Sequence, residues 1–252
     1  MISQKENGAG PSVFKRRSLP LGKLAIPPPG TVHLWFLDFD RLGNPLQGDE
    51  QAPASTLNAR QARALRRFYL RLLLGAYLGV PGKDVEIARR VSGKPVLAGA
   101  AAGSGLDFSN ANSPGCCLVG IAAGAPVGVD LEVAGRRVQD PLSLARRYFS
   151  AAEAREMAAL APERLDEAFL RAWACKEAVV KAAGHGIANR LNRFSVSCVP
   201  GEPEAVRSMD DDDPGAWRLA MVQPSERHVG SIALRQTALS LEAFRLDAPG
   251  KR

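Results

Sequence analysis

The sequence predicts an α+β fold with a largely antiparallel sheet. Segments of alternating polar and apolar residues, typical of strands, are grouped between two long helical patterns instead of alternating with helices one by one. Hydrophobic residues make up 46% of the chain and charged residues 23%, which is ordinary for a globular protein. A length of 252 residues suits one large domain or two small ones.

We expect residues 1–30 to form a flexible, basic tail. They carry five Lys or Arg residues against one Glu, contain three consecutive prolines at 27–29 and hold few large apolar side chains. A solvated tail and an arm for nucleic acid or another partner are both open interpretations. We expect the tail to be dispensable for chemistry.

The ordered part is expected to begin at Thr31. Residues Thr31–Asp38 alternate and contain β-branched and aromatic side chains, which predicts a strand. A helical pattern covers Asn58–Leu78 and stops near Gly79. A short strand over Val85–Arg90 and a turn at Gly93–Pro95 follow.

Two strands in the middle of the chain, Cys116–Ile121 and Pro126–Glu132, are expected to form a hairpin through residues 122–125. The acidic run Asp210–Asp213, followed by Pro-Gly, is expected to be a solvated loop. A further strand is predicted at Phe194–Val199, and the strands that complete the sheet are predicted at Trp217–Val222 and His228–Ala233.

The second half of the chain carries two further helix signals. Ser150 and Glu153 have the spacing of a capping box, which predicts a helix from Ala151 to about Leu160. A long helical pattern runs over Asp166–Ala183, and Gly184 stands where a helix C-cap is expected.

Composition excludes several classes of protein. The best apolar stretch, residues 116–129, is 14 residues long and too short to cross a bilayer, and the N-terminus lacks the apolar core of a secretory signal. The four cysteines and three histidines show no metal-ligand spacing, which favours reduced, structural thiols. We expect a cytoplasmic protein without a membrane partner.

The segment Gly128–Glu132 carries the first candidate for chemistry. On a strand, Asp130 and Glu132 point to one face while Val129 and Leu131 point to the other. Two adjacent carboxylates repel each other unless a cation lies between them, and oxygen ligands at this spacing suit Mg²⁺. The alternative is a polar, solvent-exposed strand end.

The second candidate lies on the long helix of the second half. Trp173, Glu177 and Lys181 follow one another at intervals of four residues and therefore share a stripe. An ordinary helix ion pair between Glu177 and Lys181, worth about 0.3–0.5 kcal/mol, is the alternative. We expect Trp173 to pack rather than to take part in chemistry.

The third candidate is a run of arginines on the first long helix. No acidic residue interrupts it, and guanidinium groups bind phosphate in a bidentate manner. An ordinary solvated helix face is the alternative. The run consists of Arg60, Arg63, Arg66, Arg67 and Arg71.

Together, these motifs resemble those of the 4′-phosphopantetheinyl transferases, of the type that activates surfactin synthetase. Gly128–Glu132 matches the family pattern (V/I)G(V/I)D(L/I)E. After 40 intervening residues, Trp173–Lys181 matches (F/W)xxKExxxK and is followed by the Ala-Ala-Gly-His-Gly-Ile of residues 182–187. Gly93–Pro95 fits the family's G-(K/R)-P turn, and the resemblance extends from Thr31 to Phe244.

The resemblance implies a fold of two similar α/β halves, residues 31–125 and 126–248, related by pseudo-twofold symmetry with the active site in the cleft between them. It also implies a reaction. The 4′-phosphopantetheine arm of coenzyme A moves to a serine of an apo acyl or peptidyl carrier protein, and 3′,5′-ADP is released. Mg²⁺ is the usual metal.

The resemblance assigns roles to the acidic residues and to one lysine. Asp130, Glu132 and Glu177 would hold Mg²⁺ against the pyrophosphate of coenzyme A. Glu177, or a metal-linked water beside it, would take the proton from the serine hydroxyl. Lys181 would stabilise charge on the phosphates and the leaving group.

The coenzyme A contacts are carried over in the same way. Lys94, Lys176 and Arg67 are candidates for its phosphates. The family usually places a His that reaches the 3′-phosphate region where this chain has Asn110, and an amide donates a hydrogen bond but carries no charge.

Two other functions compete with the transferase. A Mg²⁺-dependent nuclease or phosphodiesterase would also use clustered carboxylates and a lysine. A non-enzymatic nucleic-acid-binding module would use the arginine run and the tail. Aromatic residues make up 6% of the chain and occupy core-like positions, unlike a base-stacking surface. We therefore expect coenzyme A and a carrier protein as partners, no nucleic acid, and a monomer.

Overall fold

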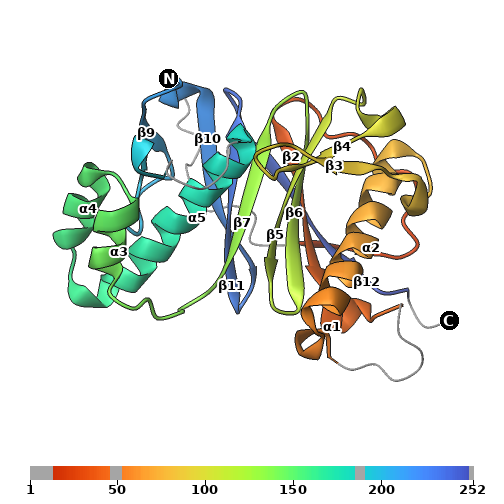
Figure 1. Cartoon of the computed structure of the whole chain (residues 1–252), viewed down its shortest axis with the longest axis horizontal. Helices are drawn as coiled ribbons and strands as arrows, with labels where there is room; N and C mark the ends of the chain where they lie inside the picture. Colours follow the sequence, from red (N-terminus) through yellow and green to blue (C-terminus); the bar gives the residue numbers. More distant parts are fainter. Residues whose placement is uncertain (1–13, 46–52, 185–190, 250–252) are drawn as a thin grey trace, which may run out of the picture.

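The computed structural model describes residues 14–45, 53–184 and 191–249. It has four layers, in which two β-sheets are packed face to face between helices (Figure 1). Helix α2 (Ala59–Leu78) covers the outer face of one sheet, and helix α5 (Leu165–Ala183) covers the outer face of the other.

The larger sheet has five strands, and the strand pairs that involve β12 are parallel. The other two pairs are antiparallel. In spatial order the strands are β1 (Lys15–Ser18), β12 (Ser240–Asp247), β2 (Thr31–Asp38), β6 (Cys116–Ala123) and β5 (Leu106–Ser113).

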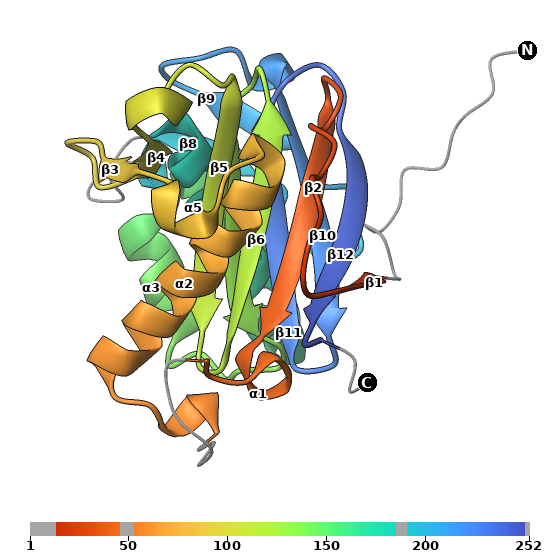
Figure 2. The same cartoon turned by 90° about the vertical axis from the view of Figure 1, so that its right-hand side faces the viewer.

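The smaller sheet has three antiparallel strands, β10 (Trp217–Ser225), β11 (His228–Arg235) and β7 (Val127–Val133). Two hairpin-like pairs flank the sheets: β3 (Ile87–Arg89) with β4 (Pro95–Leu97), and β8 (Phe194–Val196) with β9 (Val206–Met209). In the turned view, β3 and β4 project from the body of the protein (Figure 2).

Three helix ends match the predicted signals, namely the capping box of Ser150 and Glu153 and the C-cap positions Gly79 and Gly184. Asn58 and Gln61 form a capping box at the start of α2, and Gly79 ends it in the left-handed conformation that glycine adopts readily. Gly184 ends α5 in the same way. The remaining helices are α1 (Phe39–Leu42), α3 (Pro141–Tyr148) and α4 (Ala151–Ala158), with 3₁₀ turns at Ala54–Thr56, Gly82–Asp84, Gly99–Ala101, Pro162–Arg164, Leu191–Arg193 and Pro214–Ala216.

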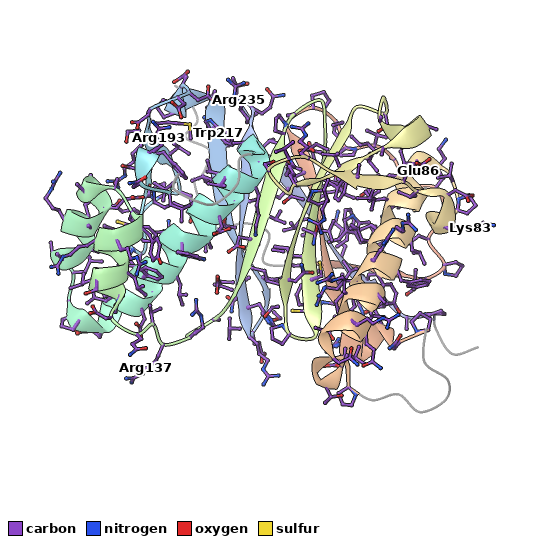
Figure 3. The ribbon with its side chains drawn as sticks, viewed as in Figure 1. Lys83, Glu86, Arg137, Arg193, Trp217 and Arg235 are labelled. Carbon is purple, nitrogen blue, oxygen red and sulfur yellow. The ribbon has the colours of Figure 1, made fainter. Side chains whose placement is uncertain are left out.

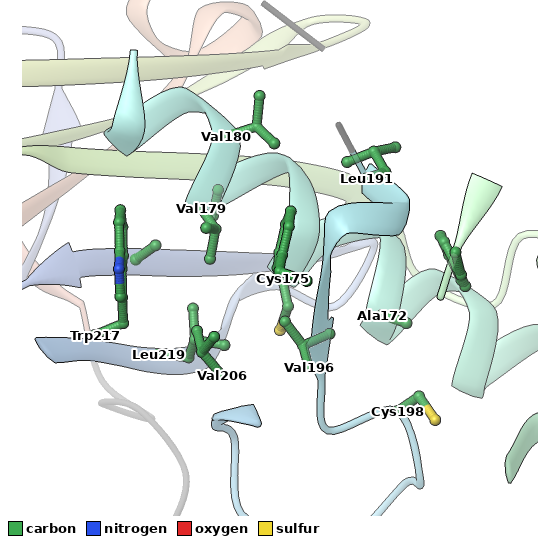
Figure 4. Packing of buried hydrophobic residues seen from close by; sticks show 14 of the residues in the cluster. Ala172, Cys175, Val179, Val180, Leu191, Val196, Cys198, Val206, Trp217 and Leu219 are labelled. Atoms are coloured by element: carbon green, nitrogen blue, oxygen red, sulfur yellow. The ribbon is translucent and has the colours of Figure 1, made fainter. Parts of the chain in front are cut away.

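Three apolar clusters fill the spaces between the layers. One lies between α2 and the larger sheet, one lies between the two sheets, and one lies beneath α5. In the third cluster, Cys175 and Val179 of α5 pack with Trp217 and Leu219 of β10 (Figure 4). None of the helices within the described residues combines the length and the hydrophobicity that a membrane span requires.

The predicted hairpin between the central strands is wrong. β6 pairs with β5 and β2 in the larger sheet, whereas β7 pairs with β11 in the smaller one. The chain changes sheets at residues 124–126 and β7 crosses over β6, so that a Cβ atom on Gly120 would lie 2.6 Å from Val129. The small polar residues of β5 gave no strand signal, although this strand is the true hairpin partner of β6.

The prediction of a flexible tail over residues 1–30 is also wrong for its second part, while residues 1–13 lie outside the described residues. Residues Lys15–Ser18 form β1, which pairs in parallel with β12, and Arg16 contacts Asp247 at 2.6 Å. Leu19, Leu21 and Leu24 then pack against the cluster beneath α2. The exposed basic side chains of β1 masked its strand character because it is an edge strand.

Removal of residues 1–24 should therefore lower stability. Loss of β1 and of three partly buried leucines is expected to cost at least about 3 kcal/mol, or roughly 6 °C in Tm. Thermal unfolding, followed by circular dichroism, compares this variant with one that lacks only residues 1–13 and retains β1. Equal Tm values for the two truncations would show that the segment does not support the fold.

The last strand connects the two predicted halves. β12 belongs by sequence to residues 126–248, but it pairs with β2 of residues 31–125.

The acidic loop Asp210–Asp213, which we expected to be solvated, contacts one end of the smaller sheet. Asp212 forms two 2.8 Å contacts with Arg235 and accepts a hydrogen bond from the Trp217 indole. Figure 3 shows Arg235 and Trp217 at that end and Arg137 at the opposite end.

Candidate active site

The Asp130 and Glu132 side chains face α5, as the strand alternation predicts. Val129 and Leu131 point the other way, into the cluster between the sheets. Asp130 is 7% exposed, so its carboxylate is not the solvated strand end of the alternative interpretation.

Gly128 lets β7 come close enough to α5 to form this site. A Cβ atom at this position would lie 1.9 Å from the carbonyl oxygen of Ala178 and 2.6 Å from the amide nitrogen of Ala182. The backbone of the strand therefore touches the backbone of the helix. On the neighbouring strand, the Ser231 hydroxyl donates a hydrogen bond to the Ala174 carbonyl oxygen at 2.8 Å.

Lys181 joins the strand motif to the helix motif. Its Nζ atom lies 2.6 Å from Oδ1 of Asp130 and 4.0 Å from Oε2 of Glu177. The close contact is thus with the strand carboxylate, 51 residues away in sequence, and the i,i+4 contact with Glu177 is the longer one. The two motifs form one site and are not two unrelated surface features.

The acidic side chains of this site carry more negative charge than their protein partners neutralise. Burial raises the pKa of Glu177 to about 7, and the charges of Asp130 and Glu132 add to this effect against the opposing charge of Lys181. Burial and the Asp130 charge also raise the pKa of Glu132, which contacts Arg136 at 3.1 Å. Oδ2 of Asp130 is buried and has no hydrogen-bond partner among the residues that the structure describes.

These residues fit a divalent cation by chemistry, although the arrangement is not a closed metal site. No group of three His, Cys, Asp or Glu side chains in the described part of the chain is close enough to hold a metal. Lys181, as an internal cation, contacts Asp130 instead. The unpartnered carboxylate oxygen and the raised pKa values of its neighbours nevertheless indicate a need for further positive charge.

Lys94 lies in the predicted turn but is already engaged. Its ammonium group contacts Oδ2 of Asp107 at 2.6 Å and the carbonyl oxygen of Val127 at 3.2 Å, and its side chain is 8% exposed. Asp107 also accepts a hydrogen bond from the Val127 amide at 2.8 Å. The pair braces β4 and β5 against the start of β7. Binding of a coenzyme A phosphate by Lys94 stays a prediction, and it would require this ion pair to open.

Lys176 does not reach the site. Its side chain is fully buried and is turned toward Glu153 of α4, 2.9 Å away. Burial lowers the pKa of Lys176, and the Glu153 charge opposes that shift. The expected contact of Lys176 with a phosphate does not fit this geometry, because the sequence pattern could not show which way the side chain turns.

Arg67 is on α2, and Asn110 is on β5 of the larger sheet, which α2 covers. Arg67 is exposed on α2, and no ion pair with a described residue engages any arginine of the run. Asn110 is half-buried on β5, opposite Val119 of β6. Their contacts with coenzyme A stay predictions.

Two charged residues with clear roles were missed by the sequence analysis. Asp107 neutralises Lys94, and Glu153 neutralises Lys176. Glu153 carried a local signal only for helix capping, and Asp107 carried none. Both act through partners that are distant in sequence.

Comparison with known proteins assigns the chain to a family. A family model described as the 4′-phosphopantetheinyl transferase superfamily matches residues 126–233, which include all four residues of the site. The chain is 32% identical over 217 residues to the 4′-phosphopantetheinyl transferase HetI of Nostoc sp., covering 81% of this chain and 87% of that protein.

More distant similarities agree. The 4′-phosphopantetheinyl transferase psf-1 of Bacillus pumilus is 28% identical over 191 residues, covering 71% of this chain and 79% of that protein. The human L-aminoadipate-semialdehyde dehydrogenase-phosphopantetheinyl transferase is 26% identical over 195 residues, covering 71% and 63%.

Proposed function

Because this chain belongs to the 4′-phosphopantetheinyl transferase superfamily, we propose that it moves the 4′-phosphopantetheine arm of coenzyme A to a serine of an apo carrier protein and releases 3′,5′-ADP. One observation carries the proposal for this chain. The buried carboxylate of Asp130 on β7 meets Glu177 and Lys181 of α5 across two elements that are distant in sequence. Phosphoryl transfer requires negatively and positively charged side chains in the same site.

Asp130, Glu132 and Glu177 would hold a Mg²⁺ ion. The unpartnered oxygen of Asp130 and the raised pKa values of the other two support this assignment. When bound, the ion would neutralise negative charge on the pyrophosphate of coenzyme A.

Glu177 is suited to accept the serine proton. Its pKa of about 7 makes the carboxylate a stronger base than an exposed Glu while leaving a substantial deprotonated fraction near neutral pH. Loss of the serine proton allows the hydroxyl oxygen to attack the β-phosphorus of coenzyme A.

Lys181 supplies a mobile positive charge. A quarter of its side chain is exposed, so its ammonium group can turn from Asp130 toward a phosphate without leaving the site. It would stabilise the charge that develops on the leaving 3′,5′-ADP. The arginines of the run on α2, of which Arg60, Arg63 and Arg67 are exposed, would contribute further contacts to coenzyme A phosphates.

The finer features of the family belong to the same proposal. Each sheet has one long helix packed on its outer face, and each of these helices ends at a left-handed glycine, which supports two halves of similar construction. The active cleft would lie where the hairpin-like pair β3–β4 approaches the end of α5, since Arg90 and Lys94 lie beside Gly184. We propose a monomer that acts on acyl or peptidyl carrier proteins.

Release of the nucleotide product tests this function against hydrolysis. The protein is incubated with coenzyme A and Mg²⁺, with and without an apo carrier protein, and nucleotides are separated by chromatography. A transferase forms 3′,5′-ADP only when the carrier is present. Formation of 3′,5′-ADP without carrier, or cleavage of DNA or RNA in parallel reactions, would instead support the phosphodiesterase or nuclease.

A further inference from the structure

The inference concerns the buried ion pair between Lys176 of α5 and Glu153 of α4. Lys176 is 0% exposed and Glu153 is 1% exposed. The pair lies at the edge of the cluster beneath α5, where Leu191 packs beside the helix and Val196 of β8 lies beneath it (Figure 4).

The hydrogen-bonding capacity of both partners is used. The three ammonium protons of Lys176 have three acceptors: Oε2 of Glu153 at 2.9 Å, the carbonyl oxygen of Leu191 at 2.6 Å and that of Phe194 at 2.5 Å. The Phe194 ring also lies under the ammonium, 4.1 Å from its nitrogen to the ring centroid.

The Glu153 carboxylate is equally occupied. Oε2 accepts a hydrogen bond from the Ser150 amide at 2.8 Å, and Oε1 accepts one from the Val196 amide at 2.8 Å. The pair therefore ties together the start of α4, the middle of α5, the 3₁₀ turn at Leu191–Arg193 and strand β8.

This network affects the active site because Lys176 is the sequence neighbour of Glu177. Lys176 precedes Glu177, and successive helix residues point about 100° apart, so the direction of one side chain determines the direction of the other. A rotation of α5 that moved Lys176 from its three acceptors would also turn Glu177 and Lys181 away from Asp130.

We propose that Lys176 is a positioning residue, whose buried pair with Glu153 fixes the rotation of α5 so that Glu177 and Lys181 face Asp130. This inference rests on the proposed transferase function. It replaces the expectation that Lys176 binds a phosphate, because that role would break three contacts and leave Glu153 charged and buried.

A double-mutant cycle tests the pair itself. Lys176→Met and Glu153→Met are made singly and together, and thermal unfolding is measured for all four proteins. Each single change leaves one charge buried without its partner, so the double variant should have a higher Tm than either single variant. Additive losses of Tm would overturn the coupling, and this readout is independent of enzymatic activity.

Kinetics of the double variant separate positioning from the alternatives. We expect kcat to fall by about 10- to 100-fold because the reacting groups are displaced, with the KM for coenzyme A unchanged within about twofold. Unchanged kcat would show a merely structural pair. A large rise in KM at unchanged kcat would show a phosphate ligand.

Two further variants complete the design. Arg207→Gln breaks an exposed pair with Glu156 of the same helix α4 and should leave kcat unchanged. If the double variant does not fold, Glu153→Gln retains the shape of Glu153 and is expected to lower kcat without raising KM; wild-type kinetics in this variant would overturn the proposal. A wild-type protein without transferase activity would instead refute the proposed function, leaving the Tm cycle as the test of the pair.

Discussion

Glu177→Gln is expected to reduce phosphopantetheinyl transfer by about 10²- to 10⁴-fold, the usual contribution of a general base. The amide retains the shape of Glu177 but neither accepts the serine proton nor carries negative charge. Initial rates are measured with a responsive apo carrier protein. Glu167→Gln, a change of an exposed acid in the first turn of the same helix, serves as the matched control and should retain wild-type activity.

The Glu177→Gln variant should be less active than the wild type but more stable at high pH. Because the folded-state pKa of Glu177 is raised from 4.5 to about 7, the protein loses stability as pH rises through that range. Glu177→Gln removes this loss and should unfold at a higher temperature than the wild type at pH 8 in the presence of a chelator. An inactive variant with a lower Tm would point to misfolding and contradict the assignment of Glu177.

Gly128→Ala is expected to have the largest effect on folding. The new methyl group would lie 1.9 Å from the Ala178 carbonyl oxygen, and neither backbone can yield without separating β7 from α5. We expect a loss of about 3 kcal/mol or more in the free energy of unfolding. Transfer should also be lost, because Asp130 would move away from Glu177 and Lys181.

The matched control is Gly103→Ala. A Cβ atom at Gly103 meets nothing within 4 Å, and this substitution should stay within about 0.5 kcal/mol of the wild type. Denaturant unfolding of both variants gives the comparison. A Gly128→Ala protein with wild-type stability would show that the strand and the helix are not in close contact.

Local signals in the sequence predict the elements that carry the site. The capping box at Ser150, the C-cap glycines Gly79 and Gly184, and the alternation around Asp130 each depend on a few neighbouring residues. Each of these signals acts between residues that lie within one or two turns of each other along the chain. The structure confirms these predictions.

Long-range pairing accounts for what the sequence could not show. β1 pairs with β12 across more than 200 residues, and Arg16 meets Asp247 at a separation of 231. The hairpin prediction failed because β7 pairs with β11 and packs on α5, and the close contact of Gly128 with Ala178, 50 residues later, leaves no local signal in the sequence.

The same limit applies to the charged side chains. A lysine in a helix motif can face a ligand or a buried acid, and only the position of Glu153 decides the case for Lys176. Asp107 likewise determines the present contact of Lys94. The family resemblance, and not the local patterns, implied that Asp130, Glu177 and Lys181 belong to one site, and the structure places the Lys181 ammonium 2.6 Å from Asp130 and 4.0 Å from Glu177.

The mass of the carrier protein gives the most direct test of the transferase itself. A panel of apo carrier proteins is incubated with the full-length protein, coenzyme A and Mg²⁺, and each carrier is examined by intact-mass spectrometry beside a variant whose acceptor serine is alanine. We predict that at least one carrier gains one phosphopantetheine group and that its serine variant gains none. No mass gain on any carrier, or an equal gain on the serine variant, would contradict transfer to the carrier serine.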